Sequence, residues 1–197
     1  MNPGIKHDLS KVVPFFRFRG IMKGAEPWGS GHINDTYRLH IEQGGRDMYY
    51  ILQRINDKVF PHVDKMMDNI RRVTTHIREK LEKIPDSNYS RESLCIVYTL
   101  DDKPFYLDVY GNFWRAYVFV EHARTYDFVS SPEQAYQAAK AFGRFQSMLR
   151  DLPGGPLHEV IPDFHNTPRR FEKFQAALAA DKLGRAAAAQ AESSSSK

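Results

Sequence analysis

The spacing of hydrophobic residues changes several times along this chain, and the order of the changes limits the folds open to it. Residues 20–28, 36–43 and 48–55 read as three strands. Gly44 and Gly45 lie between the last two, and paired glycines supply the positive φ angles of a tight hairpin. The first part of the chain is therefore predicted to be an antiparallel sheet.

Between Pro61 and Pro85 the apolar residues recur at steps of three and four, which predicts one helix with an apolar face. Strands return at 94–100, 104–110 and 112–120. We therefore expect an α+β lobe of about five antiparallel strands with one crossing helix. The predicted apolar face of the helix consists of Val63, Met66, Met67, Ile70, Val73, Thr74, Ile77 and Leu81.

Helices are predicted on either side of this lobe. A short helix over 8–18, stopped or kinked near Pro14, precedes the sheet. After the sheet, Ser131 is the predicted N-cap of a second helix, with Pro132 at its first position and Gln134 completing a capping box. The buried stripe predicted for that helix is Tyr136, Ala139, Phe142, Phe145 and Leu149.

A third helix is predicted to open at Thr167 and Pro168 and to carry Phe171, Phe174 and Leu178. The apolar pattern then ends, and the chain finishes in an Ala-rich and Ser-rich tail that has nothing to bury. A natural domain rarely stops in this way, so we expect the chain to be a fragment of a longer protein.

The composition excludes several classes of protein. Of the 197 residues, 42% are hydrophobic and 26% charged, which is typical of a globular chain. The net charge of +4 is spread among interspersed acids and bases, so we expect no nucleic-acid partner. No segment has the length of a membrane span, and we expect no membrane partner. The lone Cys95 fits a reducing compartment, so the expected location is the cytoplasm.

The most informative stretch runs from Trp28 to Thr36, between two predicted strands. It contains Gly29, Ser30, Gly31, His32 and Asn34. Glycines let a backbone approach phosphate oxygens, and successive N–H groups in such a turn can bind an anion. The alternative is a hairpin loop that happens to hold two glycines, because the spacing matches neither a Walker loop nor a dinucleotide fingerprint.

Two charged residues follow this loop in a suggestive order. Arg54 ends the third predicted strand, and Asp68 lies in the helix that comes next. In kinase-like folds a cation at this strand end reaches the nucleotide phosphates and is held by an acid from the following helix. The alternative is a strand-end arginine and a helix aspartate that both face solvent.

The chain resembles the aminoglycoside phosphotransferase and choline kinase superfamily, and within it the sugar 1-kinases that act on N-acetylhexosamines. The resemblance runs from about residue 15 to 180. It rests on GSGHINDTYRL, YILQRIN, MMDNIRRVTTHI and WRAYVFVE, and on the later GRFQ and DFHNTPRRFEKF. It implies a protein-kinase-like fold and ATP-dependent transfer to a hydroxyl of a small molecule, most suitably a sugar.

The resemblance also implies roles for particular residues. The loop from Gly29 to Asn34 would bind the phosphates, with Arg54 in the place of the usual lysine and Asp68 as its partner. The backbone of Val120, Glu121 and His122 would bind adenine, and His32 would face the sugar or the transferred phosphoryl group. The implied domains are a nucleotide-binding lobe over 1–120, a hinge linker over 121–130, the first helices of an incomplete helical lobe over 131–180, and a tail over 181–197.

Members of this family carry a catalytic loop of the form HxDxxxxN and a following acid that holds Mg²⁺. Both would lie beyond the helix at 168–180, so no catalytic or metal-binding residue is assigned here and the isolated chain is expected to be inactive. Residues 62–69 match HxDxxxxN letter for letter, and Asp108 imitates the metal-binding acid. Their positions, at the start of an amphipathic helix and in a strand before a turn, indicate chance matches.

Two other functions compete with the kinase hypothesis. The chain could be a non-catalytic, kinase-like binding module. Its second and third predicted helices would then have uncovered apolar faces, and it would self-associate or need a partner. A basic nucleic-acid binder is the weaker alternative, because the aromatic residues lie in predicted core stripes rather than on an exposed face.

Overall fold

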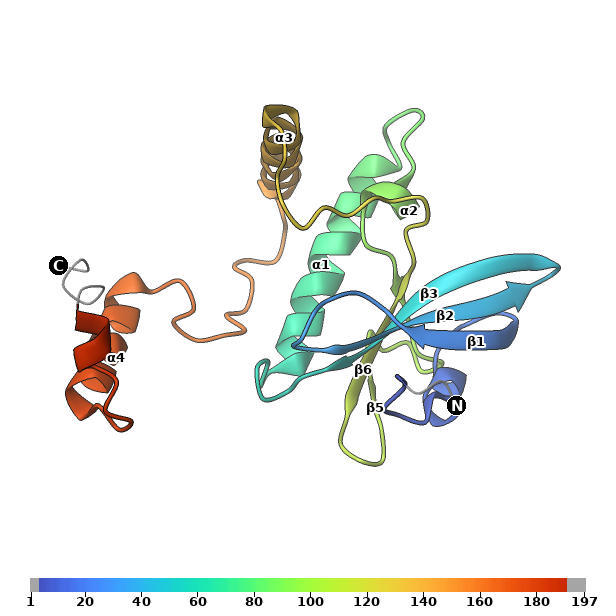
Figure 1. The fold of residues 1–197 in the computed structure, drawn as a ribbon. Helices are drawn as coiled ribbons and strands as arrows, with labels where there is room; N and C mark the ends of the chain where they lie inside the picture. The colour runs from blue at the N-terminus through green and yellow to red at the C-terminus, as the bar shows by residue number, and fades with distance from the viewer. Residues whose placement is uncertain (1–3, 191–197) are drawn as a thin grey trace. The chain divides into compact units, whose positions relative to one another are not determined.

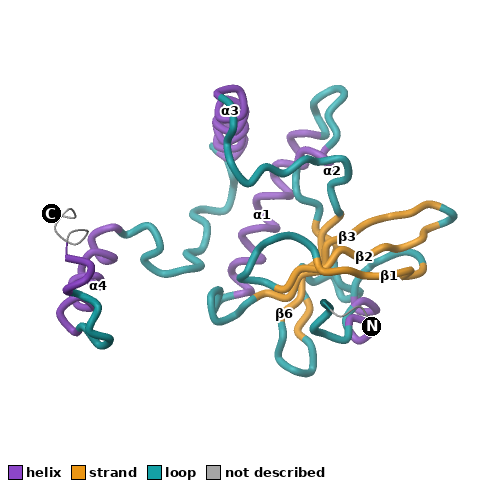
Figure 2. Tube along the Cα trace, in the orientation of Figure 1, coloured by secondary structure: helices purple, strands orange, loops and turns teal. Residues whose placement is uncertain are grey.

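The computed structural model describes residues 4–190, in two compact units that meet at 160/161. The first unit is built on one antiparallel sheet of six strands (Figures 1 and 2). The strand order is β1-β2-β3-β6-β4, and β5 also pairs with β6. The strands are β1 (Ile21–Pro27), β2 (Asp35–Gln43), β3 (Arg46–Ile55), β4 (Ile96–Val97), β5 (Tyr106–Leu107) and β6 (Phe113–Val118).

The predicted α+β class is confirmed, with one strand more than the five expected. The crossing helix is α1 (Val63–Leu81), and the short α2 (Tyr89–Glu92) follows it. α1 buries five of the residues assigned to its apolar face, namely Val63, Met66, Met67, Ile77 and Leu81. The HxDxxxxN match at 62–69 therefore lies on this packed helix, as its position indicated.

The helix predicted over 8–18 is wrong. Two 3-10 turns stand there instead, over Leu9–Lys11 and Val13–Phe15. Pro14 has no N–H to donate and disfavours the α conformation in the residue before it, so a continuous helix does not form. Phe16 then adopts an extended conformation and bridges to Thr99.

The two faces of the sheet pack against different parts of the chain. Tyr50 and Leu52 of β3 lie on one face, in a core with Leu9, Val12 and Phe16; we call it the N-terminal face. Ile55 lies on the other, in a core with Val63, Met66 and Met67 of α1; we call it the α1 face. Since successive side chains of a strand alternate between faces, every residue of β3 can be assigned to one of them.

The segment after α3 (Pro132–Leu149) runs back along α1. The guanidinium of Arg72 donates hydrogen bonds to the carbonyl oxygens of Pro153, Gly155 and Pro156, at 2.9, 2.7 and 3.2 Å. Asn69 exchanges two hydrogen bonds with the backbone of His158, at 2.8 and 2.9 Å. These side-chain bonds fix residues 153–158 against α1 without regular secondary structure.

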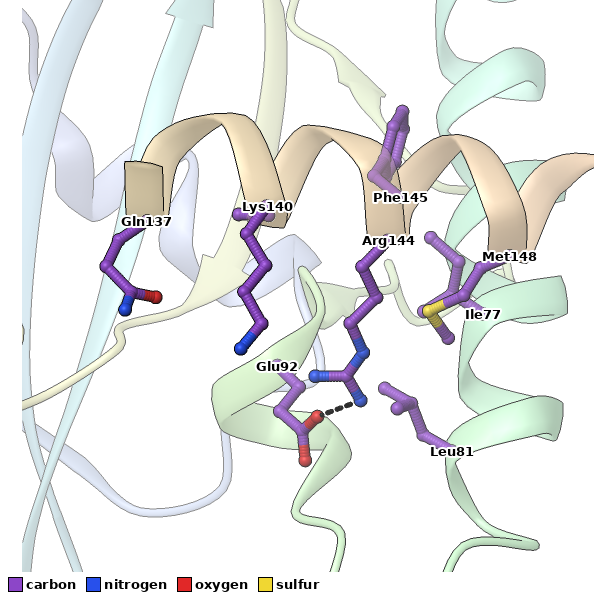
Figure 3. Close-up of a pocket in the computed structure, with 9 residues that line it drawn as sticks. Ile77, Leu81, Glu92, Gln137, Lys140, Arg144, Phe145 and Met148 are labelled. Atoms are coloured by element: carbon purple, nitrogen blue, oxygen red, sulfur yellow. Dashed lines mark hydrogen bonds and ion pairs between the residues drawn. The ribbon is translucent and has the colours of Figure 1, made fainter. Parts of the chain in front are cut away.

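A groove lies between α1, α2 and α3, with a volume of about 290 Å³ (Figure 3). Arg144 of α3 crosses it to form an ion pair with Glu92 of α2 at 2.8 Å, drawn as a dashed line in Figure 3. At the far end of α3 the carbonyl oxygen of Met148 accepts hydrogen bonds from His76 and Lys80 of α1, at 3.1 and 2.7 Å. Polar contacts therefore attach α3 to the rest of this unit.

The buried stripe predicted for α3 is wrong in this chain. Tyr136, Phe142 and Phe145 are 59%, 71% and 45% exposed, and α3 has no fully buried residue. The start of the helix is as predicted, since the Ser131 hydroxyl accepts a hydrogen bond from the Gln134 amide. The capping box is not completed, because the Gln134 side chain accepts from Ser130 instead of Ser131.

The second unit contains α4 (Thr167–Ala180), which opens at the predicted position. The Asn166 side chain caps it by accepting from the Arg169 amide, and Asp181 ends it in the left-handed conformation. Phe171 and Phe174 remain partly exposed on its surface. A 3-10 turn follows over Ala187–Ala189, and the Ser-rich end of the predicted tail, 191–197, lies outside the described residues. Within residues 4–190 no helix is both long and apolar enough to cross a bilayer.

Candidate functional site

The glycine loop connects β1 to β2 as predicted. The Trp28 amide donates to the Thr36 carbonyl at 2.9 Å and closes the base of the loop. Gly29 has a φ of +81°, which a residue with a side chain rarely adopts. Residues 29–33 are exposed, and the side chain of Asn34 accepts from the Asn56 amide at 2.9 Å. The loop is therefore open to solvent along its length and tied at its downstream end to the end of β3.

Arg54 lies close to the end of this loop. Antiparallel pairing places it directly opposite Asp35, and its Nε donates to the Asp35 carboxylate at 2.7 Å. Lys6 and His7 bond the same carboxylate at 2.8 and 3.2 Å. Burial alone would raise the pKa of the Asp35 carboxyl, but the hydrogen bonds from Lys6, Arg54 and His7 hold this pKa well below its usual range.

The predicted pairing of Arg54 with Asp68 is wrong in this structure. Arg54 is in phase with Leu52, so its side chain lies on the N-terminal face, whereas Asp68 belongs to the helix that covers the opposite face. The Asp68 carboxylate pairs with Arg71 at 2.6 Å and with His158 at 3.4 Å. The hydrogen bond from Arg71 is the largest factor that lowers its pKa. Asp68 therefore has a local role on the surface of α1.

The α1 face carries a polar row that the sequence analysis missed. Thr36, Gln53 and Arg115 lie directly opposite one another on β2, β3 and β6. Gln53 donates to the Thr36 hydroxyl at 2.7 Å, and its side-chain oxygen accepts from two nitrogens of Arg115 at 2.9 and 2.7 Å. The alternation of β6 could have indicated this residue, because Arg115 is out of phase with the apolar Trp114 and Ala116.

An aromatic cluster occupies the other end of the same face. The Arg38 guanidinium stacks over the ring of Trp28 at 4.2 Å and lies 5.1 Å from the Tyr49 ring and 5.6 Å from the Phe119 ring. Arg38 also pairs with Glu26 of β1. Trp28 thus packs against its own sheet, and Trp114 is buried in the core.

The predicted linker, 121–130, follows β6 after two intervening residues, Phe119 and Val120. Val120 and Glu121 are half-buried, and the Glu121 carbonyl accepts from Arg91 of the α2 helix at 2.8 Å. His122 has a positive φ of 55° and is exposed. The chain therefore leaves the sheet in a tight turn, and the Glu121 carbonyl of the linker already accepts a hydrogen bond from within the chain.

The last two candidate residues are His32 and Asp108. His32 is exposed and forms no hydrogen bond or ion pair with the described part of the chain. Asp108 accepts hydrogen bonds from the Trp114 indole and from the amides of Tyr110 and Asn112, so it orders the turn before β6. No group of three or more metal-binding side chains occurs among residues 4–190.

Comparison with known proteins bears on the fold of the chain. No family model matches the chain. Among solved structures it is similar to the spectinomycin phosphotransferase APH(9)-Ia, whose structure contains ADP and spectinomycin. The TM-score is 0.46 and the sequence identity 16%, over 87% of this chain and 51% of that one. The chain therefore spans about half the length of that phosphotransferase.

Replacing Asp35 by Asn tests the network at the end of the loop. Because the folded pKa of this carboxyl lies below its unfolded value, its contribution to stability is present above about pH 4 and is lost as the pH falls through the folded pKa. At pH 7 Asp35→Asn should lower the free energy of unfolding by about 1–3 kcal/mol. It should also weaken the acid dependence of this free energy, as measured by urea unfolding between pH 3 and 7.

Asp47→Asn is the matched control, because that carboxylate is 62% exposed and its one side-chain partner among residues 4–190 is His40, across the hairpin. This control should change the unfolding free energy very little. Equal losses for the two variants would contradict a special role for Asp35.

Proposed function

We propose that this chain contains the nucleotide-binding part of an ATP-dependent phosphotransferase that acts on a hydroxyl of a small molecule. The observation that carries the proposal is the attachment of the glycine loop to the end of β3. The Asn34–Asn56 and Asp35–Arg54 contacts hold the downstream end of the loop there, while Gly29 to Ile33 remain exposed. A loop that is fixed at its ends and open along its backbone suits the binding of a polyphosphate.

In this proposal each part of the site has a separate task. The amides from Gly29 to Asn34 bind the phosphates, and Arg54 positions the end of the loop through Asp35 rather than through Asp68. The backbone of Val120 and His122 binds the adenine base, with the Glu121 carbonyl held by Arg91. His32, exposed on the loop, faces the acceptor or the transferred group.

The acceptor in this proposal is a sugar of the N-acetylhexosamine type. It is supported by the motifs GSGHIN at 29–34 and LQRIN at 52–56, which resemble the sugar 1-kinase branch of the superfamily. The nucleotide would be used with Mg²⁺, which neutralises charge on its phosphates. From the same resemblance we place both the metal site and the catalytic loop outside residues 4–190.

A non-catalytic binding module is the second candidate. It is supported by the exposed aromatic side chains of α3, Tyr136, Phe142 and Phe145. Contiguous exposed apolar surface is typical of an interaction site, so a module of this kind would self-associate or bind a partner protein. We favour the kinase because the interaction hypothesis does not explain the open glycine loop.

We propose a cytoplasmic location for the protein. Cys95 is the lone cysteine of the chain, and burial raises the pKa of its half-buried thiol. A thiol in this state reacts slowly and fits a compartment that keeps cysteines reduced.

A charge placed in the glycine loop tests the phosphate site. A side chain added at Gly31 would meet no neighbouring atom, and Gly31 does not have a positive φ. Gly31→Asp should therefore leave the melting temperature unchanged, but its carboxylate should repel phosphates and weaken ATP binding about tenfold or more. The measurement is isothermal titration calorimetry with ATP.

Gly143→Asp in α3 is the control, since it adds the same charge where a new side chain also meets no atom. Its ATP affinity should equal that of the unmodified chain. Equal ATP affinity of all three proteins would argue against a phosphate-binding loop.

A separate experiment tests the proposal that this chain lacks the catalytic part of the enzyme. The 197-residue chain is incubated with MgATP and a panel of amino sugars, choline and aminoglycosides, and ADP release is measured. We expect no turnover, because positioning and electrostatic groups supply most of the rate of phosphoryl transfer and the catalytic loop is assigned elsewhere. Turnover by this chain alone would refute that assignment.

A further inference from the structure

Arg115 is an internal cation without an acidic partner. It lies in the middle of β6, half-buried between the sheet and α1. It forms no ion pair with any carboxylate of the described residues. Burial lowers the pKa of its guanidinium, since removal from water disfavours the charged form. An internal charge without a counter-ion is unfavourable, and structures usually pair it.

The groups around Arg115 orient its side chain without neutralising its charge. The Gln53 amide oxygen accepts from Nε and one terminal nitrogen, at 2.9 and 2.7 Å. Within residues 4–190 the hydrogen-bond acceptors of the other terminal nitrogen are the sulfur atoms of Met66 and Met67, both at 3.9 Å, and thioethers are weak acceptors. The guanidinium also lies 5.2 Å from the centre of the Tyr117 ring. The Arg115 side chain is thus held in one orientation, and no carboxylate of the described residues neutralises its positive charge.

Arg54 and Arg115, the two arginines near the candidate site, differ in whether a carboxylate neutralises their charge. Arg54 is paired with Asp35 on the N-terminal face. Arg115 is joined to the glycine loop across the α1 face through Gln53 and Thr36. Thr36 lies two residues after the loop ends at Asn34, and its hydroxyl accepts from Gln53, so its own hydrogen is available to a ligand. Thr36 and Gln53 therefore connect the end of the glycine loop to the Arg115 guanidinium.

We infer that Arg115, rather than Arg54, is the residue of this chain that balances the charge of the nucleotide phosphates, with Gln53 as its positioning residue. The inference rests on the proposed function and assigns its charge-balancing step. The ligand class is a nucleoside polyphosphate that lies on the α1 face, beneath the loop. Adenosine, which carries no phosphate, does not need this residue.

The test is Arg115→Met in the full 197-residue chain, with thermal unfolding and calorimetric titrations of ATP, ADP and adenosine. Methionine has a similar length and suits the neighbouring thioethers. Its introduction loses the two hydrogen bonds to Gln53 but also removes an internal unpaired charge, so the melting temperature without ligand should change little. Affinity for ATP should fall about tenfold or more, and affinity for adenosine should stay the same. Arg46→Met removes one positive charge at the exposed β2–β3 turn and should leave every affinity unchanged.

The other outcomes separate the two hypotheses. If the unmodified chain binds none of the three ligands, the proposed function fails and the role of Arg115 fails with it. If the unmodified chain binds ATP and Arg115→Met binds it equally well, only the role of Arg115 is overturned. A lower melting temperature with unchanged ATP affinity would mean that Arg115 is a structural residue. Arg115→Lys keeps the charge and should retain more ATP affinity than Arg115→Met, whereas equal losses would contradict a charge-balancing role.

Discussion

The register between β2 and β3 decides which charged groups can act together in this protein. Because residues 35 and 54 stand opposite each other, Asp35 neutralises Arg54 on the N-terminal face. The same register places Thr36 opposite Gln53 on the α1 face, and the next strand adds Arg115. A shift of one residue would exchange these two sets of side chains between the faces. The charge pattern around the glycine loop therefore follows from backbone pairing.

Local sequence patterns predicted most of the elements of the fold. The periodicity of 63–81, the double glycine of the hairpin and the Ser131-Pro132 start signal each correspond to an element of the structure. The helix over 8–18 failed because Pro14 interrupts it after one turn. The stripe of α3 was correctly read as apolar, but whether such a stripe is buried depends on the rest of the chain, which periodicity does not describe.

The candidate site was predicted less completely, for a physical reason. The loop could be located from Gly29 and Gly31, since glycine marks the backbone itself. The partner of Arg54 could not, because choosing between Asp35 and Asp68 requires the pairing register and the face that α1 covers. Arg115 was missed because a charged residue within a run such as WRAYVFV gives no sign of whether an acid lies opposite it.

The most direct measurement is a crystal structure of the chain with a non-hydrolysable ATP analogue. The proposed arrangement predicts that the triphosphate lies on the α1 face, with its oxygens bonded to the amides of residues 29–34 and close to the Arg115 guanidinium. A triphosphate bound on the N-terminal face, against Arg54 and Lys6, would contradict it.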